Sequence, residues 1–341
     1  MLPKVSVIIP EKNEALVIEK CVSSILNSDY PKEKLELIVV CNGCSDNTEK
    51  ILKKHKGKFK LVKMGPKISK GQVLNYSLKY STGEIIGIFD ADCIVEKNCI
   101  SEAAKNFYDK NVDGVGGAIK SSNKNENILT RALSMEIIAS SFIENIFSLI
   151  GRNVYFQGKN MFIRKSALLK LEGFNEKIPS EDFEISSRMR KARMEAVFEK
   201  KALAWQQEPN DINSYVRQRK RWALGGAILN RGSKDILSLT DLIHGFPYYA
   251  SFLGLLSFLF LGIFFFWHSE IFFYFFLLLF LPVFFMEFFS KIYMKEPLSD
   301  LVFIPIFFLL GSIYIFLIPK AYIDIMLEKG FVWFTPKRSS L

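Results

Sequence analysis

The chain has 341 residues, a formal net charge of +10 and a hydrophobic content of 49%. This length accommodates one large α/β domain and a smaller unit. A basic balance suits nucleic acid, anionic lipid or phosphorylated substrates. The sequence contains no nucleic-acid-binding motif, and its apolar residues gather from Phe246 onward, so we exclude nucleic acid and expect membrane lipid as a partner.

The start of the chain and its cysteines point to a reducing compartment. A strand-like run, residues 5–9, begins almost at once, without the pattern of a signal peptide. We therefore expect the polar part to stay in the cytoplasm, and the odd count of five cysteines agrees. Cys41 and Cys44 have C-x-x-C spacing, and Cys93 and Cys99 would complete a zinc or redox site if the two loops met. Reduced structural thiols are the simpler interpretation.

Apolar strands and helices alternate over the first 90 residues. We predict strands at residues 4–10, 35–40, 59–62 and 84–89, and helices at 14–26, 48–55 and 71–80, with Ser45 or Asp46 as a helix cap. Such alternation predicts a mostly parallel sheet with helices on both faces. Ligands bind beyond the carboxyl ends of strands in these sheets. The polar residues at those ends are Asn13, Asn42, Asp46, Asp90 and Asp92.

The next stretch continues the mixed pattern. We predict a long helix at 128–150, a strand at 154–163, a short helix at 166–171 closed by Gly173, a helix at 181–191, a strand at 196–205 and a basic helix with aromatic residues at 212–228. The domain expected from this pattern covers residues 1–235.

Three apolar runs follow, at about residues 246–267, 271–289 and 301–318. Each is close to the ~20 residues that span a bilayer. We therefore expect a membrane domain at 236–341 in a multi-pass protein of the cell membrane, with Lys291 and Lys295 on the cytoplasmic side. Three crossings would place the basic tail outside, so either the tail breaks the positive-inside rule or one run is re-entrant. A weaker segment at 321–334 suits the membrane interface.

Asp90-Ala91-Asp92, at the end of an apolar strand, can hold a divalent cation. When a nucleotide-sugar donor gives up its sugar, the nucleoside diphosphate departs with negative charge. Mn²⁺ or Mg²⁺ held by carboxylates and phosphates neutralises that charge. One aspartate would face the nucleotide while the other meets the metal. A solvated turn is the plainer alternative.

Transfer to a hydroxyl also requires a base, and Asp182 beside Glu181 is the candidate. The plainer alternative is that Ser180 caps a helix whose first turn favours acids. The two roles are compatible.

The run Gln218-Arg219-Lys220-Arg221-Trp222 places Gln218, Arg221 and Trp222 on one helical face. Arg221 can pair with a diphosphate, Trp222 offers a flat face to a sugar, and Gln218 can hydrogen-bond an acceptor. The alternative is a basic amphipathic helix on anionic lipid.

Together these motifs resemble those of family 2 glycosyltransferases of the GT-A fold. The similarity is greatest to the membrane-bound branch with the cellulose, chitin and hyaluronan synthases and related polysaccharide or glycolipid transferases. It covers about residues 4–230, and the further matching segments are Val7–Glu14, Val39–Thr48, Lys70-Gly71 with Leu74-Asn75, Gly158–Arg164 and Gly173–Glu176. The resemblance implies a GT-A domain, Mn²⁺ or Mg²⁺ as cofactor, and an inverting, single-displacement reaction.

The resemblance also implies a role for each matched residue. Donor contacts are implied for Pro10, Asn13, Glu14, Asn42, Asp46, Lys70, Asp90 and Arg221. Asp92, with Asp90, is the implied metal ligand, and Asp182 the base. The acceptor side and the donor–acceptor junction would comprise Gly158, Asn160, Glu181, Gln218 and Trp222. One departure is Cys41-Asn42, where the family usually has two aspartates. Asn42 can donate and accept, so we expect a UDP-sugar, with a GDP-sugar as the alternative.

The leading interpretation is a membrane-anchored inverting transferase that moves a hexosyl or N-acetylhexosaminyl group to a hydroxyl of a lipid-linked or saccharide acceptor. A processive polysaccharide synthase is the alternative. The Gln-x-x-Arg-Trp motif favours it, and the small number of spans opposes it unless protomers form an oligomer. The third interpretation is a catalytically silent, lipid-docked partner subunit of another membrane enzyme. The intact acidic pairs argue against it. A transporter is disfavoured because Glu287 is almost the only ionisable residue in the apolar runs.

Overall fold

A computed structural model describes residues 2–55, 57–66, 69–151, 154–232 and 269–327. The chain forms two compact units. The first comprises residues 1–123, 144–210 and 330–341, and the second comprises residues 124–143 and 211–329. The predicted boundary near residue 235 separates a catalytic domain from a membrane domain, and it stays a prediction.

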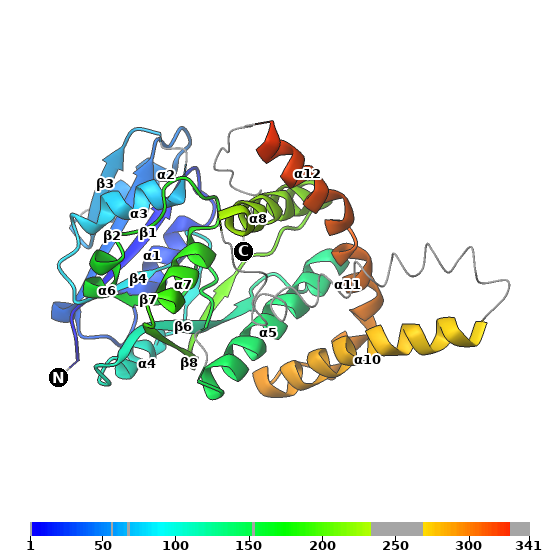
Figure 1. Ribbon diagram of the computed structural model, residues 1–341. Helices are drawn as coiled ribbons and strands as arrows, with labels where there is room; N and C mark the ends of the chain where they lie inside the picture. The colour runs from blue at the N-terminus through cyan, green and yellow to red at the C-terminus, as the bar shows by residue number, and fades with distance from the viewer. Residues whose placement is uncertain (1, 56, 67–68, 152–153, 233–268, 328–341) are drawn as a thin grey trace. The chain divides into compact units, whose positions relative to one another are not determined.

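An eight-stranded mixed sheet forms the centre of the first unit (Figure 1). The strand order is β3 (Lys60–Met64), β2 (Leu35–Asn42), β1 (Val5–Glu11), β4 (Ile85–Ile88), β7 (Met161–Arg164), β6 (Val112–Ser121), β8 (Glu195–Gln206) and β5 (Ile94–Val95). The first four are mutually parallel. β7 runs antiparallel to β4 and β6, β8 parallel to β6, and β5 antiparallel to β8. The α/β prediction is therefore confirmed, with a parallel half and a mixed half.

Helices cover the sheet and complete its core. They are α1 (Ile18–Leu26), η1 (Lys32–Lys34), α2 (Thr48–Lys53), α3 (Lys70–Leu78), α4 (Cys99–Asn106), α6 (Lys165–Lys170) and α7 (Glu181–Lys191). All seven residues of β1 are buried, as expected for a central strand covered on both faces. α1 contributes Cys21, Val22 and Ile25 to the same core. The C-terminal ends of β1, β2 and β4 thus lie together on a rigid frame.

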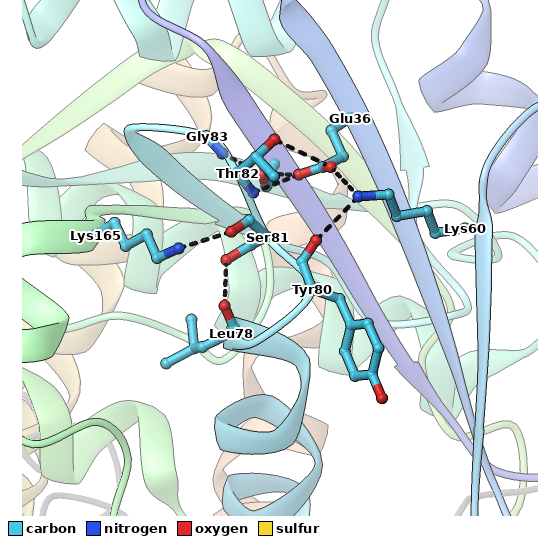
Figure 2. Close-up of polar contacts among 9 residues, drawn as sticks. Glu36, Lys60, Leu78, Tyr80, Ser81, Thr82, Gly83 and Lys165 are labelled. Carbon is cyan, nitrogen blue, oxygen red and sulfur yellow. Dashed lines mark hydrogen bonds and ion pairs between the residues drawn. The ribbon is translucent and has the colours of Figure 1, made fainter.

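At the opposite, N-terminal end of these strands, Glu36 at the start of β2 connects neighbouring segments through hydrogen bonds, as Figure 2 shows. Its carboxylate accepts hydrogen bonds from Lys60 Nζ (2.6 Å), from the Thr82 backbone N–H (2.7 Å) and from the Ser6 hydroxyl. The pKa of Glu36 is about 2, because these hydrogen bonds outweigh partial burial, which acts to raise it. Glu36 therefore joins β1, β3 and the α3–β4 loop around one ionised group.

Two predicted boundaries were wrong. The helix predicted from residue 14 begins at Ile18, because Asn13 adopts a left-handed backbone (φ +59°) and the Glu14 N–H bonds to Thr48 Oγ1. The strand predicted from residue 154 begins only at Met161. The preceding backbone forms hydrogen bonds with side chains instead. The Tyr155 N–H donates to the Glu144 carboxylate, and the Phe156 N–H donates to the Ser186 hydroxyl.

The second unit is helical. It holds the first part of α5 (Ile128–Leu149), α8 (Ile212–Gly232), α10 (Ser269–Met294), η2 (Leu298–Phe303), α11 (Ile304–Gly311) and α12 (Tyr314–Met326). α8 packs on α12 through Ala223 and Ala227 against Tyr314, Leu317 and Ala321 (Figure 1). Between α5 and α8, the buried Arg219 makes two hydrogen bonds to the Glu136 carboxylate.

Two described helical stretches are long and apolar enough to cross a membrane, Ile128–Leu149 and Leu298–Met326. The first is mostly buried within the protein, like the core helix of a soluble domain, and the second is mostly not. The second stretch contains the predicted run at 301–318, and α10 contains the run at 271–289. The run at 246–267, the tail, and the segment at 321–334 beyond residue 327 lie outside the described residues.

Candidate active site

A buried lysine joins the two acidic motifs of the first unit. Lys70, at the first residue of α3, places its Nζ 2.6 Å from Asp90 Oδ1 and 3.3 Å from Glu181 Oε1. It also donates to the Gly158 carbonyl oxygen at 2.6 Å. Burial acts to lower the pKa of Lys70, but the carboxylates of Asp90, Glu181 and Asp182 outweigh it and raise the pKa. Lys70 is therefore a fixed cation between residues that lie far apart in the sequence.

The position of Lys70 is set by contacts between α3 and the segment before α7. The Asn75 side chain accepts from the Phe174 N–H at 2.8 Å and donates to the Phe174 carbonyl at 2.9 Å. Ser69 Oγ donates to the Glu176 carbonyl at 2.7 Å. Glycine allows the close approach, since a Cβ at Gly71 would lie 2.6 Å from the Asn175 carbonyl oxygen. The Lys-Gly and Gly-Phe-Asn-Glu segments predicted from the family pattern therefore fit together.

Asp182 lies in the first turn of α7 against Gly158. Gly158 has φ +73°, and a Cβ atom there would lie 2.6 Å from Asp182 Oδ2. Ser186 fixes this arrangement, since its hydroxyl donates to the Asp182 carbonyl and accepts from the Phe156 N–H. Tyr155 stacks on Phe183 with ring centroids 4.4 Å apart. The loop at residues 154–160, predicted as strand, thus carries Gly158 to the carboxylate of the candidate base.

Asn160 serves the fold of this loop. Its backbone is left-handed (φ +51°), and its amide donates to the carbonyls of Ala118 and Ala202, each at 2.8 Å. The side chain is buried and joins β6 to β8, so its predicted acceptor contact stays a prediction.

The predicted donor residues lie at the ends of β1 and β2. Asn13 exchanges hydrogen bonds with Ser45, accepting from the backbone N–H at 2.8 Å and donating to Oγ at 3.1 Å. Asp46 accepts from the N–H groups of Thr48 and Ala15 at 3.0 and 3.2 Å. Pro10, Glu14 and Asn42 are buried beside them in the same unit. The structure therefore brings this predicted group together, and it shows Asn13 and Asp46 holding the loops to each other.

Asp90 and Asp92 fit a divalent cation by their chemistry. Both follow β4, and their carboxylates are the oxygen donors that Mg²⁺ and Mn²⁺ prefer. The Asp90 side chain is 35% exposed. Among the described residues, no group of three His, Cys, Asp or Glu donors forms around this pair. The other coordination positions would therefore belong to phosphate oxygens and water, an arrangement typical of Mg²⁺.

The remaining predicted residues, Gln218, Arg221 and Trp222, lie on α8 in the second unit. The three residues share this helix, as predicted, and their roles stay predictions. Within the part of the chain that the structure describes, the buried Gln218 Oε1 has no hydrogen-bond partner. Trp222 is packed on its own helix, with the Arg219 guanidinium 4.3 Å from its ring centroid. The junction of these residues with the acidic motifs stays a prediction.

Two clusters were missed by the sequence in part or in full. Cys41 and Cys44 were considered for a zinc or redox site from their C-x-x-C spacing, but their third neighbour, Glu11, gave no signal. Cys93 and Cys99 do not join it, and Cys99 Sγ lies 3.4 Å from Asn160 Oδ1 instead. The other is Arg219 with Glu136, for which 83 residues of separation left no pattern to follow.

Comparison with known proteins identifies the family. The family described as "Glycosyltransferase like family 2" matches residues 3–225. The probable glycosyltransferase YdaM of Bacillus subtilis is 34% identical over 236 residues, which are 66% of this chain and 55% of that protein. The beta-monoglucosyldiacylglycerol synthase of Trichormus variabilis is 29% identical over 233 residues, 66% of this chain and 49% of that protein. The chain spans about half the length of these curated relatives.

The fold agrees with this assignment. The mannosyltransferase PcManGT from Pyrobaculum calidifontis, solved in complex with GDP-Man and Mn²⁺, superposes with a TM-score of 0.61 at 17% identity over 96% of this chain and 88% of that one. The chain belongs to glycosyltransferase like family 2, because the family match covers well over half of it. The predicted GT-A fold, with helices following at the C-terminal end, is confirmed.

Proposed function

We propose that this protein is a membrane-anchored inverting glycosyltransferase. It transfers a hexosyl or N-acetylhexosaminyl group from a nucleoside-diphosphate sugar, expected to be a UDP-sugar, to a hydroxyl of a lipid-linked or membrane-associated acceptor. One observation carries the proposal: Lys70 binds both Asp90 and Glu181, and Gly158, whose carbonyl Lys70 also binds, abuts the Asp182 carboxylate. The acidic motif for the phosphates and the acidic motif for the acceptor thus meet at one cation.

Each of these residues has a distinct task in the reaction. Asp182 accepts the proton of the acceptor hydroxyl, so that the oxygen can attack the anomeric carbon. Lys70 holds Asp90 and Glu181 in place and adds positive charge close to the departing diphosphate. A Mn²⁺ or Mg²⁺ ion bound by Asp92 and Asp90 would supply charge neutralisation for that diphosphate. Asp182 is half-buried, so solvent reaches the candidate base from one side.

The acceptor is proposed to be a membrane lipid or lipid-linked saccharide. The relative from Trichormus variabilis is a beta-monoglucosyldiacylglycerol synthase. The apolar stretch Leu298–Met326 is long enough to anchor the protein, and most of it is not buried within the protein. Both support a membrane-anchored catalytic domain, which we place on the cytoplasmic face as part of this proposal.

A processive polysaccharide synthase is the second candidate. The Gln-x-x-Arg-Trp motif on α8, with the unpaired Gln218 Oε1 in the described part of the chain, favours an acceptor held through several rounds. Product length separates the two, since a single added sugar supports the first candidate and a ladder of products the second.

The test is a donor screen with the full chain in detergent. Each common UDP- and GDP-sugar is offered with Mn²⁺ or Mg²⁺ and a diacylglycerol or glycolipid acceptor, and release of nucleoside diphosphate is measured. GDP-sugars belong in the screen because PcManGT was solved with GDP-Man. We expect Asp182→Asn to lower kcat by on the order of a thousandfold while donor affinity changes little. Unchanged turnover in this variant would refute Asp182 as the base, and no release from any donor would refute the proposed activity.

A further inference from the structure

The ends of β1 and β2 carry a second cluster of metal-ligating groups that the transfer reaction does not use. Glu11 is the last residue of β1, and Cys41 lies opposite it in the parallel register of β2. Cys44 follows after Asn42 and Gly43, and Gly43 has φ +62°. That left-handed turn folds the chain back, so that both thiols face the same carboxylate.

The three side chains are in direct contact. Glu11 Oε1 lies 2.6 Å from Cys41 Sγ and 3.0 Å from Cys44 Sγ, and the two sulfur atoms are 3.1 Å apart. One donor atom from each residue lies within 4.8 Å of the other two. A single carboxylate oxygen thus receives both thiols, although each S–H is a weak donor.

Glu11 is the most unusual member of the cluster, because it is an acidic residue of which only 1% is exposed. Its second oxygen, Oε2, has no hydrogen-bond partner among the described residues. A buried carboxylate with one unpaired oxygen is costly. The group therefore has unused coordinating capacity on Oε2, while Oε1 contacts both sulfur atoms.

From this geometry we infer that Glu11, Cys41 and Cys44 form a binding site for a thiophilic divalent cation of the Zn²⁺ class. Two sulfur donors and one carboxylate oxygen suit Zn²⁺, whereas Mg²⁺ and Mn²⁺ prefer oxygen alone. Tetrahedral Zn–S bonds of about 2.3 Å set two sulfurs about 3.8 Å apart, so the site has to open by less than about 1 Å. Three protein ligands leave the fourth position to water.

Binding is written without a redox step. The two thiols, and the carboxyl group where it is protonated, release their protons to solvent as the metal–ligand bonds form. This site is separate from Asp90 and Asp92, whose all-oxygen donor set has the opposite preference. It does not depend on the proposed transfer reaction.

The experiment uses the full chain, reduced and freed of metal by a chelator, with Zn²⁺ alone as the probe. Zinc bound after gel filtration is measured by mass spectrometry, and Co²⁺ is added in parallel because a thiolate-to-cobalt charge-transfer band reports sulfur ligands directly. We expect one zinc per chain and a clear charge-transfer band. Cys41→Ser and Cys44→Ser should each lose the band and the tight zinc, and Glu11→Gln should weaken binding while keeping part of the band.

Two variants serve as controls. Cys99→Ala removes a buried thiol outside the cluster and should keep one zinc. Asp92→Asn should keep the zinc even if sugar transfer is lost, so failure of the zinc site and failure of the proposed reaction are distinguishable. The inference is overturned if the reduced wild type binds no zinc, if zinc survives in both cysteine variants, or if Cys41 and Cys44 form a disulfide under the same reducing conditions. Should a cysteine variant fail to fold, the cobalt spectrum of the wild type decides alone, since a spectrum without sulfur ligation refutes the site.

Discussion

Gly158 is the residue on which the geometry around Asp182 depends. Its carbonyl receives Lys70, and its missing side chain leaves room for the Asp182 carboxylate. The backbone is also left-handed there, a conformation that costs an L-residue about 1–2 kcal/mol. A Cβ atom at this position would therefore force the Asp182 side chain to move, and the left-handed backbone adds a further preference for glycine.

Replacing Gly158 by alanine should therefore displace Asp182 and reduce turnover. We expect kcat to fall by roughly 10- to 100-fold, because a displacement of about 1 Å at a reacting group has effects of this size. The measurement is kcat and KM for the donor identified in the screen. Gly151→Ala is the matched control, since Gly151 has φ +67° and, among the described residues, no atom lies within 4 Å of a Cβ placed there. If both variants lost the same activity, the loss would reflect backbone strain rather than contact with Asp182.

Glu36, on β2, helps to hold the edge strand β3 to the sheet through Lys60. Its carboxylate is ionised in the folded protein with a pKa of about 2, below the ordinary value of 4.5. A lowered pKa means that folding favours the ionised form. The stability it contributes is fully present above about pH 4.5 and is lost as the pH falls through about 2.

Glu36→Gln should thus destabilise the protein at neutral pH by about 1–2 kcal/mol. The loss is this small because solvent screens the ion pair with the exposed Lys60. The difference from wild type should shrink as the pH is lowered from about 5 toward about 2. Thermal unfolding of the full chain in detergent, followed across this pH range, measures it. Glu49→Gln is the control, because Glu49 also pairs with lysines but is solvated, and its effect should be small. A difference that grew on acidification would contradict this role for Glu36.

The sequence predicted most elements of the sheet because their patterns are local. The apolar run of β1 and the acidic first turn of α7 are visible within a dozen residues. The loop at 154–160 could not be predicted, because its backbone groups bond to Glu144 and Ser186, and its apolar residues resemble a strand. Lys70 and Asp90 are 20 residues apart in the sequence, and Lys70 and Glu181 are separated by many more. Only the fold therefore reveals that these three residues meet.

The molecule as a whole is assembled from interleaved stretches of chain. The second unit combines residues 124–143 with residues 211–329. Arg219, with 1% of its side chain exposed, ties these stretches together through Glu136. Its guanidinium also lies 4.8 Å from the Tyr215 ring centroid and 4.3 Å from that of Trp222. The arginine next to the predicted Gln-x-x-Arg-Trp residues therefore has a structural task.

Arg219→Met should remove the guanidinium that pairs with the buried Glu136 carboxylate and destabilise the protein by about 3–5 kcal/mol. Adding Glu136→Gln should recover part of this loss, because the buried negative charge is then removed as well. Apparent melting temperature and monodispersity in detergent are the measurements. Lys220→Met is the matched control on the same helix, since Lys220 is 48% exposed and lies 3.7 Å from Asp324. Equal effects of Lys220→Met and Arg219→Met would exclude a special role for the buried pair.

The pairing of β6 with β8 has a consequence for biosynthesis. β6 ends at Ser121, whereas its parallel partner begins at Glu195, and the chain between them contributes residues 124–143 to the other unit. A growing polypeptide on the ribosome therefore keeps one side of β6 uncovered while some seventy further residues are translated. Exposed strand edges of this kind are prone to aggregation, so we expect the nascent protein to be vulnerable to aggregation in that interval.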